Sequence, residues 1–376
     1  MSIAGDRPHA FTARYSGSGA SQVDETGLAA RFARRYDAEL TMVDISPDVA
    51  DIFEDITWAL DEPHADDSAI PTWALSKAVG SSYKVALTGI GGDELFAGYW
   101  RHIGMLLGDV YSRLPRWIQQ AAAAAVGTLR EPSNGGLGVD RAKRFLRNGD
   151  ADFADRFLGY ISRMPDAGRL TLYGPALRAS FTGGAARNRL RNLFLRGGCR
   201  SGLAGALYLD YKTFLPDDVL ALSDRLAMAH SLEIRVPMVD HEFVERVFRL
   251  PQRAKVRWCV KKLLLKRALK HRISREQLRA PKRGFVGPTS AWLSHELRPM
   301  LQDELSADRL NRLGYFDADT VGRLMGEHFN RKSNHERILW ALLCFSTWHR
   351  LYVEGSAARR YQPGDASPAT VSTTRA

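Results

Sequence analysis

A short glycine-rich string that runs into an acid is the first candidate for chemistry in this chain. Gly89, Gly91 and Gly92 lie between Thr88, which ends an apolar run, and Asp93. Glycines let a backbone approach a ligand closely, and amide groups at a helix start can face phosphate oxygens. The carboxylate could offer magnesium a hard oxygen ligand. A tight strand-to-helix turn with Asp93 as its N-cap fits the same spacing, so the spacing alone leaves both interpretations open.

The segment 224–240 mixes charges with apolar residues. Arg225, Glu233 and Arg235 stand there among leucines, methionines and a valine. A charge embedded among apolar side chains is costly unless it is paired or used on a ligand. We therefore expect either a salt-bridged packing element with buried charges or the wall of a ligand cavity, and we favour the wall.

A lysine stands on a shaped loop at 279–285. Pro281 and Gly284 flank Lys282 closely and argue against a helix there. A cation held on such a loop can stabilise negative charge that develops in a transition state. The alternative is a solvated surface lysine.

Acids and a histidine gather at 61–68, just before a helical pattern. His64, Asp66 and Asp67 are metal-ligating residue types, but their spacing does not support a metal site. Acids immediately before a helix usually act as caps, and we predict a cap here.

The chain is basic, with a formal net charge of +11, and its densest basic cluster spans 253–283. Such a cluster could bind polyphosphate or RNA. Long basic side chains also cover apolar surface while their charged ends stay in water. We favour this solvated face for most of the cluster and do not expect nucleic acid as a partner.

The elements that position these residues alternate as in an α/β protein. Strands are predicted at 10–15, 39–45 and 83–88, and helices at 24–36, 49–60, 69–79 and from near Asp93. Parallel strands with crossover helices gather ligands at the carboxyl ends of the strands. We divide the chain into an α/β region (1–100), a mostly helical region (101–353) and a disordered tail (354–376) that is poor in residues able to pack.

Composition excludes several classes of protein. No run approaches the roughly 20 apolar residues that span a bilayer. The first nine residues lack the apolar core of a signal peptide, so a cytoplasmic location is expected. Cys199, Cys259 and Cys344 form no metal or disulfide pattern.

Three strings together resemble the synthetase half of glutamine-dependent asparagine synthetases of the class B type, within the PP-loop ATP pyrophosphatase group. Residues 88–99 are similar to Ser-Gly-Glu-Gly-(Ser/Ala/Gly)-Asp-Glu followed by Phe-Gly-Gly-Tyr. Residues 224–240 are similar to Asp-Arg-x-x-Met-Ala-x-Ser-Leu-Glu-x-Arg-x-Pro-Phe-Leu-Asp. Residues 279–285 are similar to Arg-x-x-Lys-x-(Gly/Gln)-Phe.

The resemblance implies a role for each matching residue. Magnesium pyrophosphate would bind at Asp93, and Lys282 would be catalytic, neutralising the departing pyrophosphate. The remaining roles are ATP contact at Ala13, Thr88 and Gly89, and a cavity wall at Arg225, Glu233 and Arg235. The implied cofactors are ATP and Mg²⁺. The implied reaction is amidation of aspartate through a β-aspartyl-AMP intermediate, with ammonia or a glutamine-derived nitrogen as donor.

The sequence also departs from the family pattern. Ile90 replaces a glutamate that handles a proton in the family, and an isoleucine cannot do so. The Ser-Gly-Gly-x-Asp-Ser string does not occur, and no N-terminal glutaminase domain precedes the first strand. We expect a truncated nucleotide-hydrolase-like parallel sheet. An inactive or split enzyme completed by a glutaminase or N-terminal partner chain, or an amidotransferase acting on another carboxylate, are the alternatives.

Overall fold

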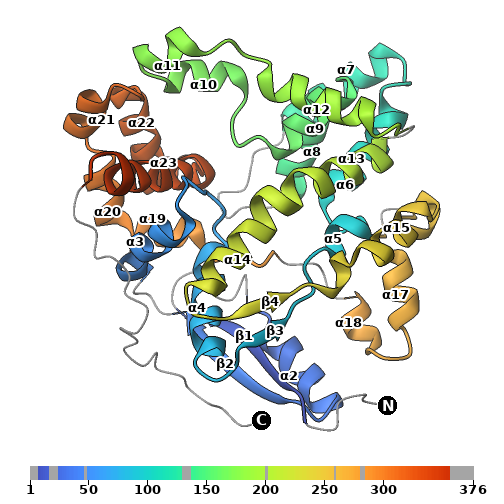
Figure 1. The fold of residues 1–376 in the computed structure, drawn as a ribbon. Helices are drawn as coiled ribbons and strands as arrows, with labels where there is room; N and C mark the ends of the chain where they lie inside the picture. Colours follow the sequence, from blue (N-terminus) through green and yellow to red (C-terminus); the bar gives the residue numbers. More distant parts are fainter. Residues whose placement is uncertain are drawn as a thin grey trace.

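A computed structural model describes residues 7–16, 24–45, 49–128, 137–199, 202–257, 260–279 and 284–355. Its strands lie together at one end of the molecule, and the helical region rises from them (Figure 1). The predicted α/β class is confirmed: parallel strands open the chain and a mostly helical region follows. The predicted disordered tail beyond Gly355 lies outside the described residues.

The first two strands form a parallel pair joined by one helix. β1 (His9–Tyr15) runs beside β2 (Glu39–Ile45) over seven residue pairs, from His9 with Glu39 to Tyr15 with Ile45. The connecting helix α2 (Thr26–Arg35) packs on both strands. These elements match the sequence prediction to within two residues at each end.

A second parallel pair joins two distant segments. β3 (Val85–Leu87) pairs with β4 (Glu233–Arg235), so the predicted strand at 83–88 meets the charged segment. Among the described residues the two pairs do not merge into one hydrogen-bonded sheet. Side chains connect them instead, because Phe11, Ala86 and Ile234 pack around one small apolar cluster.

The main core lies between the first helices and the end of the chain. α3 (Val49–Leu60) and α4 (Ala69–Gly80) bury apolar side chains against α14 (Ala221–Met228) and α23 (Glu336–Trp348). Phe53 and Trp340, for example, meet edge to face with ring centroids 5.4 Å apart. Apolar residues distributed around most of α4 explain why this helix is buried on nearly every side.

The other helices build the upper part of the molecule and its flank. They are α5 (Gly92–Leu95), α6 (Trp100–Tyr111), α7 (Arg116–Gly127), α8 (Leu137–Asn148), α9 (Phe153–Ile161), α10 (Asp166–Leu172), α11 (Pro175–Ser180), α12 (Ala185–Arg196), α13 (Gly202–Lys212), α15 (His241–Arg249), α16 (Gln252–Lys255), α17 (Leu263–Leu269), α18 (Arg275–Arg279), α19 (Thr289–Ser294), α20 (Arg298–Glu304), α21 (Ala307–Leu313) and α22 (Ala318–Phe329). Single turns of other helix types are η1 (Leu215–Leu220), η2 (Pro237–Val239) and η3 (His349–Val353). None of the described helices is both long and apolar enough to cross a membrane.

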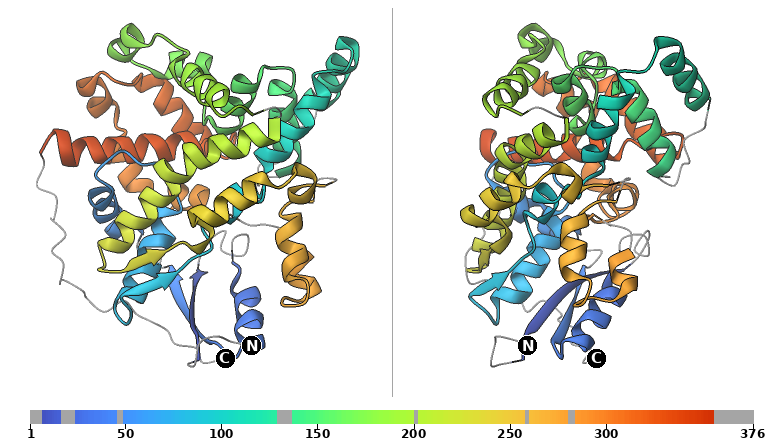
Figure 2. Two further views of the ribbon diagram at one scale, coloured as in Figure 1. Left: turned by 45° about the vertical axis from the view of Figure 1, so that its right-hand side comes forward. Right: turned by 90° about the vertical axis from the view of Figure 1, so that its right-hand side faces the viewer.

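Helices α17 and α18 form an arm that descends beside α2 (Figure 2). Neither helix of the arm buries a residue. The arm is tied to α2 by polar contacts, since the Tyr36 hydroxyl donates to the Arg272 carbonyl oxygen over 2.5 Å and Arg31 pairs with Glu276 at 3.1 Å. Most of the described basic residues of the cluster 253–283 are exposed, as predicted, whereas Lys261, Lys262 and Lys266 are half-buried and Lys255 is buried. Burial lowers the pKa of Lys255 to about 8.

Candidate functional site

The glycine turn is held against the charged segment by its backbone. The amide of Thr88 donates to the Arg235 carbonyl oxygen over 3.0 Å, which extends the pairing of β3 with β4. Gly91 has φ 91°, and a Cβ there would lie 2.5 Å from Val239 Cγ2. Only glycine fits this position, because the backbone is left-handed and the neighbouring side chain fills the space. Two strings that lie 150 residues apart in the sequence therefore form one structure.

Asp93 is not the cap of the short helix α5. The N-cap is Gly91, and no side chain caps this helix end. Asp93 instead forms an ion pair with Lys262, whose Nζ lies 3.0 Å from Oδ1. The cap interpretation is therefore wrong. It fails because the left-handed backbone of Gly91 forms the cap, so that Asp93 is the second residue of the helix.

A buried polar network supports the turn from behind. The Tyr99 hydroxyl donates to Glu94 Oε1 over 2.5 Å, and the Arg101 guanidinium lies 3.9 Å from the centre of the Tyr99 ring. Arg101 and His102 both reach Asp210 of α13, with Arg101 Nε at 2.9 Å and His102 Nε2 at 2.6 Å from Oδ2.

Burial and neighbouring charges set the protonation of two groups in this network. Burial raises the pKa of Tyr99, with the Glu94 carboxylate adding to the effect, so the phenol stays protonated. Burial alone would raise the pKa of Asp210, but Arg101 and His102 hold it below the usual range. The carboxylate is thus a fixed negative charge that holds two residues of the first turn of α6.

The charges of the segment 224–240 are not buried. The segment consists of the end of α14, the strand β4 and the turn η2. Glu233 and Arg235 pair with each other at 2.8 Å, and their side chains are 57% and 61% exposed. The alternative of a packing element with buried charges is therefore wrong for these two residues. Strand alternation explains the outcome, since it turns Ile234 inward and both of its neighbours outward.

Arg225 occupies the salt-bridged position that the sequence left open. Its Nη1 donates to the Leu60 carbonyl oxygen over 2.5 Å and to Glu62 Oε1 over 2.7 Å, and lies 3.2 Å from Asp61 Oδ1. These contacts fasten the segment after α3 to α14. Ala13 is buried in β1, and its backbone pairs with Val43. Lys282 lies outside the described residues.

His64, Asp66 and Asp67 form a half-buried cluster with several partners. His64 Nε2 lies 3.0 Å from Asp218 Oδ1, and Asp66 Oδ1 accepts from the Ser68 amide over 2.8 Å. Asp67 accepts from the Thr289 hydroxyl. Burial, together with the Asp66 charge, raises the pKa of Asp67 to about 6. The hydrogen bond between the Ser68 amide and Asp66 forms a local turn that leads into α4. No side chain caps α4, so the predicted cap is wrong.

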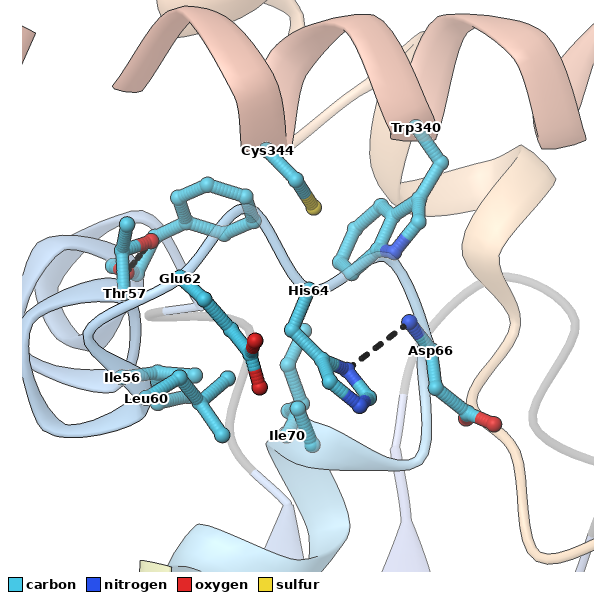
Figure 3. A pocket seen from close by; sticks show the side chains of 11 residues that line it. Ile56, Thr57, Leu60, Glu62, His64, Asp66, Ile70, Trp340 and Cys344 are labelled. Atoms are coloured by element: carbon cyan, nitrogen blue, oxygen red, sulfur yellow. Dashed lines mark hydrogen bonds between the residues drawn. The ribbon is translucent and has the colours of Figure 1, made fainter. Parts of the chain in front are cut away.

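A small pocket opens beside this cluster (Figure 3). Ile56 and Leu60 line it from α3, Trp340 and Cys344 from α23, and His64 and Glu62 from the connecting segment. None of the predicted site residues lines it. Within the described ranges, no group of three or more His, Cys, Asp or Glu side chains is arranged to hold a metal ion. A metal at Asp93 would therefore depend on oxygens that a ligand supplies.

A family model described as asparagine synthase matches residues 3–350. The chain belongs to the asparagine synthase family. A Mycobacterium bovis relative, provisionally named a glutamine-hydrolyzing asparagine synthetase, is 29% identical over 348 residues, which are 92% of this chain and 51% of the relative. Asparagine synthetase (glutamine-hydrolyzing) 1 of Bacillus subtilis is 27% identical, over 83% of this chain and 47% of that protein.

A more distant relative carries a different name. Amidase chry2 of Gibberella zeae is 26% identical over 84% of this chain and 48% of its own length. The chain thus spans about half the length of the curated relatives it matches. Family membership agrees with the resemblance that the three sequence strings carry.

Sequence reasoning missed the pairing of Asp210 with Arg101 and His102, and the contact of Lys262 with Asp93. Asp210 ends an apolar stretch of α13, and a single acid in such a stretch signals a buried pair without naming its partner. Lys262 stands in a dense run of basic residues, which conceals the one that turns inward.

Proposed function

We propose that this protein is the synthetase part of an ATP-dependent amide ligase of the asparagine synthetase type. ATP adenylates the side-chain carboxylate of aspartate with release of pyrophosphate, and a nitrogen nucleophile then displaces AMP to give the amide. One observation carries the proposal: the pairing of β3 with β4 holds the glycine turn and Asp93 beside the charged segment, and Lys262 of the α17 N-cap lies 3.0 Å from Asp93. A glycine-rich turn, a carboxylate and a cation are what a magnesium-bound polyphosphate requires.

In this proposal each predicted residue has one task. The backbones of Thr88, Gly89 and Ala13 contact ATP, and Asp93 helps to bind magnesium pyrophosphate. Magnesium, when bound, screens the phosphate charge. Lys282 stabilises the charge that grows on the departing pyrophosphate. The exposed pair Glu233 and Arg235 borders the turn, and Arg225 supports the cavity through its contacts with the segment at 60–62.

The identity of the carboxylate substrate is the second part of the proposal. Aspartate is favoured because the asparagine synthase model covers nearly the whole chain. Another carboxylate is the alternative, supported by the match to a fungal protein named as an amidase. Ile90 supports this alternative as well, because its apolar side chain cannot take the proton of an attacking amine. The nitrogen donor is ammonia, either free or released from glutamine by a glutaminase partner chain.

The direct test supplies ATP, magnesium, aspartate and ammonium chloride, so that no glutaminase is needed. AMP, pyrophosphate and asparagine should form in equal amounts, and labelled pyrophosphate should exchange into ATP when aspartate is present. Exchange that occurs with a different carboxylate and not with aspartate would identify that carboxylate as the substrate. Absence of nucleotide binding and of exchange with any carboxylate would contradict it.

Lys282→Ala separates catalysis from binding. A cation that acts on the departing pyrophosphate should lower the rate of exchange by about 100-fold or more, while ATP affinity changes by less than about threefold. Arg275→Ala is the matched control, because it removes an exposed cation of the preceding helix α18 that lies outside the three motif strings. Equal losses of rate and affinity would contradict the role given to Lys282.

A further inference from the structure

The arm formed by α17 and α18 is attached to the rest of the protein in two different ways. At its start, Leu264 and Leu265 pack against the apolar cluster that contains Leu95 and Phe96, next to the glycine turn. At its far end, α18 buries no residue. Packing therefore fixes the start of the arm, and the position of its far end depends on polar contacts.

Helix α2 makes those contacts with the turn that joins α17 to α18. The Tyr36 hydroxyl donates to the Arg272 carbonyl oxygen over 2.5 Å, and Arg35 Nη2 donates to the His271 carbonyl oxygen over 3.5 Å. Arg35 is the last residue of α2, and Tyr36 is its C-cap. The turn of the arm is thus attached to the carboxyl-terminal end of α2.

A third contact gives α18 a direction. Arg31 of α2 pairs with Glu276 of α18 at 3.1 Å. Glu276 follows the turn, whereas Arg31 precedes Tyr36, so α18 runs antiparallel to α2, beside which the arm lies (Figure 2). The start of α2 follows the carboxyl end of β1, and ligands of parallel sheets gather at that edge. Helix α18 therefore leads the chain toward the ligand edge.

The turn and α18 are joined by a reciprocal pair of hydrogen bonds. The Ser274 amide donates to Gln277 Oε1 over 3.0 Å, and the Gln277 amide donates to Ser274 Oγ over 3.2 Å. Such a capping box fixes how the chain enters a helix. The contacts of α2 with the turn consequently orient α18, which ends at Arg279, three residues before Lys282 in the sequence.

Stability does not account for these contacts. The side chains of Arg31 and Glu276 are 45% and 66% exposed, and an exposed ion pair contributes little to folding. Tyr36 is exposed as well. What the contacts determine is where the far end of the arm lies.

We infer that Tyr36 and Arg31 are positioning residues for Lys282. The inference rests on the proposed function, in which Lys282 stabilises the departing pyrophosphate. The two side chains hold the turn and α18 against α2 and thereby direct Lys282 toward the ligand edge, without contacting the nucleotide themselves. Displacing a charged group from the reacting atoms lowers the rate of a reaction more than it lowers substrate affinity.

Pyrophosphate exchange, measured together with ATP calorimetry, tests this inference. The variant Tyr36→Phe/Arg31→Ala should lower the rate of exchange by about tenfold, while ATP affinity changes by less than about twofold. Hydrogen exchange of the α18 amides should become at least about fivefold faster, because the arm has lost its attachment to α2.

The matched control removes the same chemical groups elsewhere in the molecule. The Tyr352 hydroxyl donates to the Trp58 carbonyl oxygen over 2.6 Å, and Arg323 forms an exposed ion pair with Glu327 at 3.0 Å. Tyr352→Phe/Arg323→Ala should change the exchange rate and ATP affinity by less than about twofold, and it should leave hydrogen exchange in α18 unchanged.

Two further backgrounds separate positioning from a general loss of structure. In Lys282→Ala, adding Tyr36→Phe/Arg31→Ala should lower the exchange rate by less than about twofold, because the group to be positioned is already absent. Arg31→Glu should lower the exchange rate, and Arg31→Glu/Glu276→Arg should restore it to within about twofold of the wild type, because the ion pair is formed again with its charges reversed.

The outcomes separate this inference from the proposed function. A loss of rate that requires Lys282 and that is recovered by the reversed ion pair supports the positioning role. If the wild type catalyses exchange but Tyr36→Phe/Arg31→Ala behaves like its control, or loses rate equally without Lys282, the inference is overturned and the proposed function stands. If the wild type catalyses no exchange with any carboxylate, the proposed function is overturned and the inference with it.

Discussion

The glycine turn and strand β4 are neighbours, but the charges next to the turn are buried and those on β4 are exposed. Behind the turn, Glu94 and Asp210 are 1% and 0% exposed, and both are paired inside the protein. On β4, Glu233 and Arg235 point into water and pair only weakly. Both segments carry charges beside apolar residues in the sequence. Backbone period and distant partners, and not local composition, therefore decide whether a charge is buried.

Asp210→Ala removes the shared carboxylate of the buried network and should have the largest effect on stability. Arg101 and His102 would lose their shared carboxylate, and Arg101 would remain as a buried uncompensated charge. We expect the free energy of unfolding to fall by about 3–5 kcal/mol in urea denaturation. Asp303→Ala, an exposed acid on α20, is the control and should change stability by less than about 0.5 kcal/mol. Similar losses in the two variants would remove the distinction.

Asp67 lies outside the buried network, and its titration tests whether burial also raises the pKa of an acid there. Its pKa of about 6 lies above the ordinary value of 3.8, so folding favours the protonated form. Its contribution to stability is therefore complete below about pH 4 and is lost as the pH rises through 6. Relative to Asp67→Asn, the wild type should lose up to about 3 kcal/mol between pH 4 and pH 7. Urea denaturation at several pH values measures this difference, and a difference independent of pH would show that Asp67 titrates normally.

Gly91→Ala probes the contact that joins the two regions. A methyl group would require a left-handed alanine and would meet Val239, so the variant should lose about 2 kcal/mol in thermal or urea unfolding. Gly322→Ala, at an exposed position of α22 with nothing within 4 Å, should instead gain up to about 1 kcal/mol. A neutral Gly91 variant would indicate that the turn and η2 separate easily.

Glu233→Gln removes one charge of the exposed ion pair on β4 and should have the smallest effect on stability. Removing one partner of a pair that is more than half exposed should change the free energy of unfolding by less than about 0.5 kcal/mol. The measurement is urea denaturation at low and at moderate salt. A loss comparable to that of Asp210→Ala would place this charge in a buried environment.

Much of the fold could be predicted because single segments carry their own pattern. β2 and α3 have the predicted bounds, since a run of apolar residues ends at Ile45 and helical spacing begins at Val49. β4 could not be identified, because three residues with one inward apolar side chain make no recognisable strand. Only its pairing with β3, about 150 residues earlier, defines it.

The candidate site could be predicted in its motifs but not in its contacts. The glycine string and its acid were recognisable locally, and the structure joins them to the segment 224–240. The partners of this site, Lys262 and Asp210, come from other parts of the chain, and long-range pairing leaves no local signal. The exposure of Arg235 cannot be predicted locally, because a charge among apolar residues has the same sequence pattern on a strand and in a core.

Calorimetric titration of ATP into wild type and Asp93→Asn, each with magnesium and with EDTA, tests whether the glycine turn with Asp93 binds the phosphates of a magnesium nucleotide. Magnesium should strengthen ATP binding to the wild type by at least about tenfold and should have little effect on Asp93→Asn. Equal magnesium dependence in the two proteins would contradict it.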